Sequence, residues 1–252
     1  MSPRLADLDV EVSRPEVEKY AAPLLFVHGL WTRAPIWRRM AGYLSHRGWT
    51  GHALNWHAPS RSWSETRARI QAAADALDGP LVIGHDLGAA VAMDLEHVRG
   101  AIAIAPLALG DGAPPHSLAA TARVRWARWR GADVLPTDLA ARRFFGLEAR
   151  DLHAESSAFL DEIEADAGVH AAREDLPRLV VAGDADPCST APEVERWARS
   201  RGAQVEIRKG AGHDLPYGAN WQSLSSELHR WLVRNLPEDL FLLRGDEDLR
   251  DE

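Results

Sequence analysis

The sequence is poor in cysteine, in lysine and in long apolar runs. One cysteine, Cys188, stands among 252 residues, so no disulfide can form within the chain, as suits a reducing cytoplasm. The net charge is −8, which disfavours a nucleic-acid partner. No stretch approaches the roughly 18 apolar residues that a membrane-spanning helix needs, and the N-terminal stretch MSPRLADLDVEVSRPEVEKY lacks the apolar segment of a secretory signal. We therefore expect a cytoplasmic protein that binds neither a membrane nor nucleic acid; its oligomeric state is left open.

The chain is instead built from short apolar runs that alternate with amphipathic stretches. The runs predict strands at 24–27, 50–56, 81–83, 101–105, 179–181 and 204–208. The helical periods predict helices at 34–47, 64–77, 89–98, 192–201 and 221–236. Strands that alternate with helices indicate an α/β protein with a mostly parallel sheet and helices on both faces.

One long segment interrupts this alternation. Residues 107–175 show no convincing strand, and helical stretches fit at 117–129, 138–145 and 156–172. We expect a core domain in two parts, 1–106 and 176–236, with residues 107–175 as an inserted helical cap and 237–252 as a charged tail. Because the insertion follows the end of a strand, we expect it to lie over a site at that edge of the sheet.

The first candidate for chemistry lies between the predicted strand 81–83 and the helix that follows it. The sequence Gly84-His85-Asp86-Leu87-Gly88 has the spacing of a nucleophile elbow, in which a tight turn leaves room only for glycine two residues before and after the central residue. The turn lifts the side chain of Asp86 above the sheet, at the positive end of the next helix. An ordinary strand–turn–helix with a capping aspartate would show the same local pattern.

Two further strand ends are followed by residues that could act together with Asp86, two acids and a histidine. Asp184 and Asp186 follow the strand 179–181, and His213 follows the strand 204–208 in a glycine-rich loop. The carboxyl ends of parallel strands meet at one edge of the sheet, so these residues and Asp86 are expected to converge there.

Together these residues resemble the α/β-hydrolase superfamily from about residue 22 to 236, in which nucleophile, acid and histidine follow in this order. The elbow Gly84-His85-Asp86-Leu87-Gly88-Ala89 resembles that of haloalkane dehalogenases, fluoroacetate dehalogenases and epoxide hydrolases, whose nucleophile is an aspartate. The sequence His28-Gly29-Leu30-Trp31 and the length of the insertion are more similar to small serine-type hydrolases.

The resemblance implies a role for each of these residues. The acid of the family usually stands three residues after the glycine that ends its strand, which selects Asp186 over Asp184. The pair His28-Gly29 matches the oxyanion loop, so the backbone amides of Leu30 and Leu87 would stabilise an oxyanion.

An aspartate at the elbow changes the chemistry that is expected. The reference pKa of an aspartate is about 3.9, so its carboxylate attacks without a base, and on a saturated carbon it forms an ordinary alkyl ester. On a carboxylic ester it would form a high-energy anhydride. The predicted substrates are therefore small apolar molecules with a carbon–halogen bond or an epoxide. His213, oriented by Asp186, would activate the water that cleaves the ester. No metal or organic cofactor is needed, and His52 and His57 are interpreted as non-ligands.

The groups that assist the leaving group in the resembling families are absent from their usual positions. Leu87 stands where dehalogenases often carry tryptophan, Leu30 stands where they carry asparagine, and residues 107–175 contain no tyrosine of the kind that epoxide hydrolases use. Indole N–H groups and a phenol could substitute. The candidates are Trp31, Trp126, Trp129 and Tyr217.

Two other functions remain open at the level of sequence. The scaffold could run a lyase or cyclase step in which Asp86 acts as a base, or it could be a non-catalytic module whose cavity only holds a ligand. The presence of both Asp186 and His213 argues against the second, because an inactive pocket has no need of them.

Overall fold

The structure is a computed structural model that describes residues 8–57, 62–107, 133–166, 176–235, 237 and 240–242. Its centre is a seven-stranded sheet with the order β1-β3-β2-β4-β5-β6-β7, in which only β1 runs antiparallel to its neighbour. The strands are β1 (Val10–Ser13), β2 (Leu24–Val27), β3 (Gly51–Leu54), β4 (Leu81–His85), β5 (Gly100–Ile104), β6 (Arg178–Gly183) and β7 (Gln204–Arg208). The prediction of an α/β-hydrolase fold with a mostly parallel sheet is confirmed.

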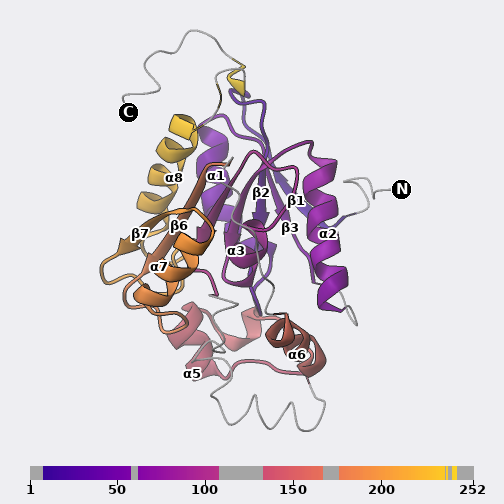
Figure 1. Ribbon diagram of the computed structural model, residues 1–252, viewed down its shortest axis with the longest axis vertical. Helices are drawn as coiled ribbons and strands as arrows, with labels where there is room; N and C mark the ends of the chain where they lie inside the picture. The colour runs from indigo at the N-terminus through magenta and orange to yellow at the C-terminus, as the bar shows by residue number, and fades with distance from the viewer. Residues whose placement is uncertain are drawn as a thin grey trace.

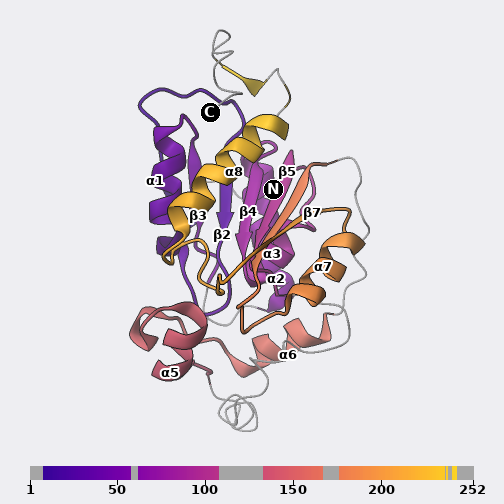
Figure 2. The same ribbon diagram turned by 90° about the vertical axis from the view of Figure 1, so that its left-hand side faces the viewer.

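Helices cover both faces of the sheet, as Figures 1 and 2 show. One face carries α1 (Arg38–His46), which follows the short turn η2 (Ala34–Trp37), and α8 (Trp221–Asn235). The other carries α2 (Trp63–Ala76), α3 (Leu87–Ala92) and α7 (Ala191–Ser200). In β2, Leu24 and Phe26 pack toward the first group of helices, and Leu25 and Val27 toward the second. Every side chain of this central strand is therefore buried, as a strand with both faces covered requires.

The described part of the segment between β5 and β6 is mostly helical. It contains α5 (Asp138–Ala140), the π-helix η3 (Ala141–Phe145), the short turn η4 (Ala149–Asp151) and α6 (Ser157–Ala165). In both views α5 and α6 lie beyond the end of the sheet toward which β2 points (Figures 1 and 2). The predicted helix at 117–129 lies outside the described residues, and the predicted domain boundaries stay predictions.

Three elements differ from the sequence-based expectation. Strand β1 was not predicted, because its sequence Val10-Glu11-Val12-Ser13 is short and half-exposed at the edge of the sheet. Helix α3 ends at Ala92 rather than near 98, since the chain turns at once and His97 adopts a φ of 54°. Helix α6 ends at Ala165 instead of extending to 172. Within the described residues, no helix combines the length and the apolar character that crossing a membrane requires.

Candidate active site

The elbow between β4 and α3 places Asp86 in a strained backbone conformation. Its φ is 56° and its ψ is −120°, a region that costs a residue other than glycine about 1–3 kcal/mol. The two glycines of the motif make the turn possible, because a Cβ on Gly84 would lie 2.2 Å from the carbonyl oxygen of Gly88 and a Cβ on Gly88 would lie 2.3 Å from that of Val27. The structure thus has the strand–turn–helix geometry that the spacing of the glycines predicts.

The carboxylate of Asp86 is buried and lies against the loop that was predicted to supply the oxyanion amides. Its Oδ2 accepts a hydrogen bond of 2.7 Å from the backbone N–H of Leu30, as expected for this amide. Gly29 allows the approach, since a Cβ there would lie 2.3 Å from Oδ2. Leu87 is the first residue of α3 and is also buried, but among the described residues no hydrogen bond joins its amide to the carboxylate.

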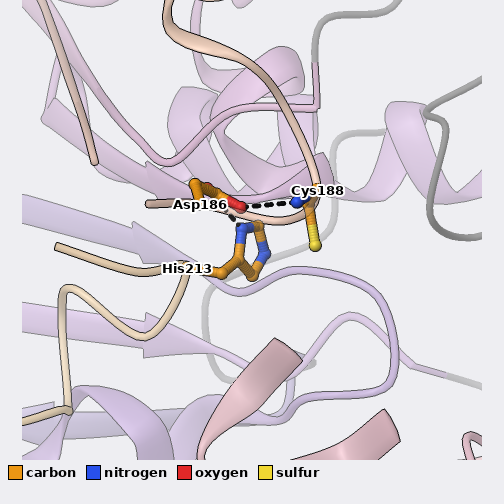
Figure 3. A group of neighbouring side chains, drawn as sticks. All are labelled: Asp186, Cys188 and His213. Atoms are coloured by element: carbon orange, nitrogen blue, oxygen red, sulfur yellow. Dashed lines mark hydrogen bonds and ion pairs between the residues drawn. The ribbon is translucent and has the colours of Figure 1, made fainter. Parts of the chain in front are cut away.

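His213 lies between the two aspartates that the sequence singled out. Its Nδ1 is 2.9 Å from Oδ2 of Asp186, and its Nε2 is 3.5 Å from Oδ1 of Asp86. Figure 3 shows the ring with one nitrogen toward Asp186 and the other turned away from it. The backbone N–H of Cys188 donates to Oδ1 of Asp186 at 2.7 Å and fixes that carboxylate. Asp184 is not part of the group, because its carboxylate accepts from the amide of Gly210.

The charges of the three groups support one another. Burial alone would lower the pKa of His213, but its interactions with Cys188, Asp186 and Asp86 outweigh burial and raise the pKa well above the ordinary value. Burial alone would raise the pKa of Asp186, but His213 and the Cys188 amide outweigh it and hold that pKa below the ordinary value. The two flanking carboxyl groups thus favour the protonated form of the His213 ring.

His85 holds the His213 loop against the elbow, a role that the sequence analysis missed. Its Nε2 lies 2.9 Å from the backbone oxygen of His213, so this nitrogen carries the proton and donates it. Burial lowers the pKa of His85 to about 4, which keeps the ring neutral. Nothing in the sequence distinguishes this histidine from any residue that precedes a nucleophile, because its partner is a main-chain atom 128 residues away.

An apolar residue of the inserted segment packs against the histidine of the site. Phe145, the last residue of η3, is almost fully buried and packs edge-on against Trp31 and His213, with ring centroids 5.8 and 5.6 Å apart. Phe145 was not among the residues predicted from the sequence. π-Helical turns are rare and often occur at functional sites, but no sequence pattern announces them.

The predicted leaving-group donors have different surroundings. The indole Nε1 of Trp31 donates to the carbonyl oxygen of Val134 at 3.1 Å, so this bond would have to break before Trp31 could bind a leaving group. Trp126 and Trp129 lie outside the described residues. Tyr217 packs edge-on against His85, and its buried hydroxyl has no hydrogen-bond partner within the described ranges. Burial raises the pKa of Tyr217, so the group remains a phenol that can donate.

One group of side chains has the donor types that bind metal ions. Asp186, Cys188 and His213 each offer one ligand atom, and these atoms lie within 4.8 Å of one another. A hydrogen bond already joins two of these three residues, Asp186 and His213. His57 faces the carbonyl of Thr32 and the carboxyl group of Glu155.

We expect Gly29→Ala to disable the site while the fold persists. The added Cβ would overlap the Asp86 carboxylate and push it off the Leu30 amide. The Leu30 amide stabilises the oxyanion that forms when water attacks the ester on Asp86, and loss of one such donor costs about 10²–10³ in rate. Decay of the covalent adduct at Asp86, followed by intact mass, should therefore slow to that extent. Gly42→Ala is the matched control, because nothing lies within 4 Å of its Cβ inside α1, and it should leave the rate unchanged. A normal rate in Gly29→Ala would contradict the placement of the oxyanion position.

Comparison with known proteins gives the same fold. The chain resembles a monoacylglycerol lipase from Paleococcus ferrophilus, with a TM-score of 0.68 and 18% identity over 91% of this chain and 99% of that one. It also resembles a soluble variant of the Saccharomyces cerevisiae monoglyceride lipase, with a TM-score of 0.70 and 13% identity over 90% and 92% of the two chains. It resembles a thermophilic esterase from Thermogutta terrifontis as well, with a TM-score of 0.64 and 16% identity over 90% of this chain and 93% of that one.

Identities this low establish the fold and not the reaction. The sequence matches no curated protein at a significant level. The model of the alpha/beta hydrolase family matches residues 24–224, a span that includes the elbow, Asp186 and His213. The chain therefore belongs to the alpha/beta hydrolase family.

Proposed function

We propose that this protein is a hydrolase that attacks a small apolar substrate with Asp86 and passes through an alkyl-ester intermediate. One observation carries the proposal. The two oxygens of the Asp86 carboxylate have different neighbours, because Oδ2 is bound to the Leu30 amide and Oδ1 faces Nε2 of His213 at 3.5 Å. A nucleophilic carboxylate needs this division, with one oxygen held as the future carbonyl and the other left to attack.

In the first half-reaction Oδ1 attacks a saturated carbon. The new bond joins Oδ1 to that carbon, and the bond between the carbon and the leaving group breaks with its electron pair. Oδ2 becomes the carbonyl oxygen of the ester without moving, so its hydrogen bond from Leu30 is already in place. The apolar ring of Phe145 next to His213 suits a small substrate without charge.

In the second half-reaction His213 serves as the base for water. Alkylation removes the negative charge of Asp86, which is one of the groups that raise the pKa of His213. The imidazolium then loses its proton more readily, and the neutral ring, oriented by Asp186, accepts a proton from water. The hydroxide attacks Cγ of Asp86, the alcohol leaves with Oδ1, and the carboxylate is restored. The proton leaves with the halide as acid, or it neutralises the alkoxide of an opened epoxide.

The leaving group decides between the two substrate classes. A halide needs an N–H donor, for which Trp126 and Trp129 remain candidates and for which Trp31 would have to give up its bond to Val134. An epoxide oxygen needs an acid, and the buried hydroxyl of Tyr217 is available for that role. The names of the structural neighbours suggest carboxylic esters instead. Asp86 argues against them, since attack of a carboxylate on an acyl carbon gives an anhydride.

The test is the origin of the product oxygen. The protein is first screened with haloalkanes, haloacids, epoxides and p-nitrophenyl esters for release of halide, diol or phenol. With any substrate found, a single turnover in heavy-oxygen water with excess enzyme should give unlabelled product and a labelled Asp86 peptide. Labelled product with an unlabelled peptide would make Asp86 a general base and replace this proposal with the lyase-type or base-only reaction.

A further inference from the structure

Trp31 follows the oxyanion amide directly and has an unfavourable backbone conformation. Its φ is 57°, and the N–H of Thr32 donates to the carbonyl oxygen of Leu30 at 2.7 Å across it. An i to i+2 hydrogen bond around a residue of positive φ is the γ-turn that is rare and strained. A tryptophan keeps such a conformation, at a cost of about 1–3 kcal/mol, only where its surroundings hold it there.

The surroundings that hold Trp31 come from the inserted segment. Its backbone N–H donates to Oε1 of Glu155 at 3.2 Å, its carbonyl oxygen accepts from the N–H of His153 at 2.6 Å, and its indole N–H donates to the carbonyl of Val134. All three hydrogen-bonding groups of this residue are thus bound by residues more than a hundred positions away. Without the inserted segment, these three groups would lose the hydrogen-bond partners that they have here.

The three partners form one unit. Val134 and Glu155 are joined by an antiparallel bridge with backbone hydrogen bonds of 2.6 and 3.0 Å. The side chain of His153 is held in turn by Arg33, whose guanidinium lies 2.7 Å from its Nδ1. We call the three residues Val134, His153 and Glu155 the clamp.

Glu155 is the member of the clamp that binds through its side chain. The same carboxyl oxygen lies 3.3 Å from Nδ1 of His57, whose Nε2 lies 2.7 Å from the carbonyl oxygen of Thr32 and must therefore carry the proton. Nδ1 of a neutral His57 is then an acceptor, so the proton between the two groups belongs to Glu155. Burial is the main cause that raises the pKa of Glu155 to about 8, and the nearby Asp86 and Asp133 add to it, while the hydrogen bond from the Trp31 amide acts in the opposite direction. A raised pKa agrees with a protonated Glu155.

We propose that Glu155 is a positioning residue that holds the Leu30–Trp31 peptide in the γ-turn and thereby keeps the Leu30 amide directed at Asp86. The peptide plane between these residues carries the N–H that Glu155 binds, and the N–H of Leu30 lies one residue before it. A shift at Trp31 therefore turns the amide that stabilises the oxyanion. The inserted segment contributes a working part of the oxyanion site and not only its cover.

The experiment compares three variants by hydrogen–deuterium exchange of the peptide that contains Leu30 and Trp31. Glu155→Ala should speed exchange of these amides by about tenfold or more, because the turn loses a bond that holds it. Glu155→Gln, which keeps an acceptor for the Trp31 N–H, should restore most of the protection. Glu162→Ala is the matched control, since Glu162 is another carboxylate of the inserted segment that binds a tryptophan amide, that of Trp63, away from Asp86. It should leave exchange at Leu30 unchanged.

The exchange result does not depend on the reaction, although the effect on catalysis rests on the proposed function. With an active substrate, Glu155→Ala should lower kcat by about 10- to 100-fold with little change in KM, as expected when an oxyanion donor is misplaced. Unchanged exchange in Glu155→Ala, or equal acceleration in Glu162→Ala, would overturn the role of Glu155. If exchange is faster only in Glu155→Ala but the protein turns over no substrate, the positioning role of Glu155 stands and the proposed reaction is rejected.

Discussion

Replacement of His213 by glutamine is expected to stop the reaction halfway, with the alkyl group still bound to Asp86. The attack by Oδ1 needs no base, and glutamine keeps the volume of the ring, so the ester should form. Its hydrolysis requires the proton acceptor that His213 supplies, and loss of a general base costs about 10²–10⁴ in rate. Intact mass spectrometry of the variant with excess substrate should show a protein heavier by the alkyl group, and peptide mapping should place it on Asp86.

Two controls make this result specific. Asp86→Asn removes the nucleophile and should show no adduct under the same conditions. Asp184→Asn changes the neighbouring acid, which binds Gly210 and not His213, and should turn over normally. A His213→Gln protein that keeps the wild-type rate would exclude the two-step mechanism, because that mechanism makes His213 the proton acceptor for water.

The second large effect concerns stability in acid. Between pH 7 and pH 5 the free energy of unfolding should fall by several kcal/mol, because burial keeps several of the described histidines neutral, four of them with a strongly lowered pKa. Burial is the main cause in each, and it lowers the pKa values to about 3 for His28, 2 for His57, 4 for His85 and 4 for His229. In the unfolded chain the same groups take up protons near pH 6.5, so a fall in pH favours unfolding.

The sign of this effect follows from the direction of each shift. Histidines with a lowered pKa contribute stability that is complete above about pH 6.5 and is lost as the pH falls toward their folded values. Glu155, with its pKa raised to about 8, acts in the opposite direction and contributes stability that is lost as the pH rises from about 4.5 to 8. Near pH 5.5 these five groups together therefore bind about three protons fewer in the folded than in the unfolded chain, which corresponds to roughly 4 kcal/mol per pH unit.

Urea denaturation at pH 7, 6 and 5 measures this dependence. His229→Gln should make this pH dependence less steep, because unfolding would then take up about one proton fewer. His229 lies on the face of the sheet away from the elbow. Its Nδ1 accepts a hydrogen bond from the indole of Trp49, and the amide oxygen of glutamine can accept the same bond. An equal midpoint at pH 7 and pH 5 would show that these rings are not buried in neutral form.

The sequence predicted the sheet and the convergence of three side chains at its edge for one physical reason. Strands of a parallel sheet are buried on both faces, so they stand out as apolar runs, and their carboxyl ends meet at one edge. Asp86, Asp186 and His213 each follow such a run, and their meeting point follows from the topology. The edge strand β1 was missed because an exposed antiparallel strand carries no such run.

The rest of the site could not be predicted, because its residues touch the core through contacts with no local pattern. Glu155 is one acid among many in the inserted segment, and only the folded chain brings it to the amide of Trp31, 124 positions away. The same holds for Phe145. Trp31 was predicted as a donor to the leaving group from its position beside the oxyanion loop, but Val134 binds that indole N–H in the structure.

The clamp on Trp31 also has a consequence for the order in which the protein folds. Closing a loop of more than a hundred residues is entropically slow compared with forming neighbouring strands and helices. The sheet between β2 and β5 joins segments that follow one another closely, so it can assemble before the segment from Val134 to Glu155 docks. During refolding, circular dichroism should thus recover before the capacity to alkylate Asp86. An early folding intermediate would have the nucleophile in place on its elbow and still be inert.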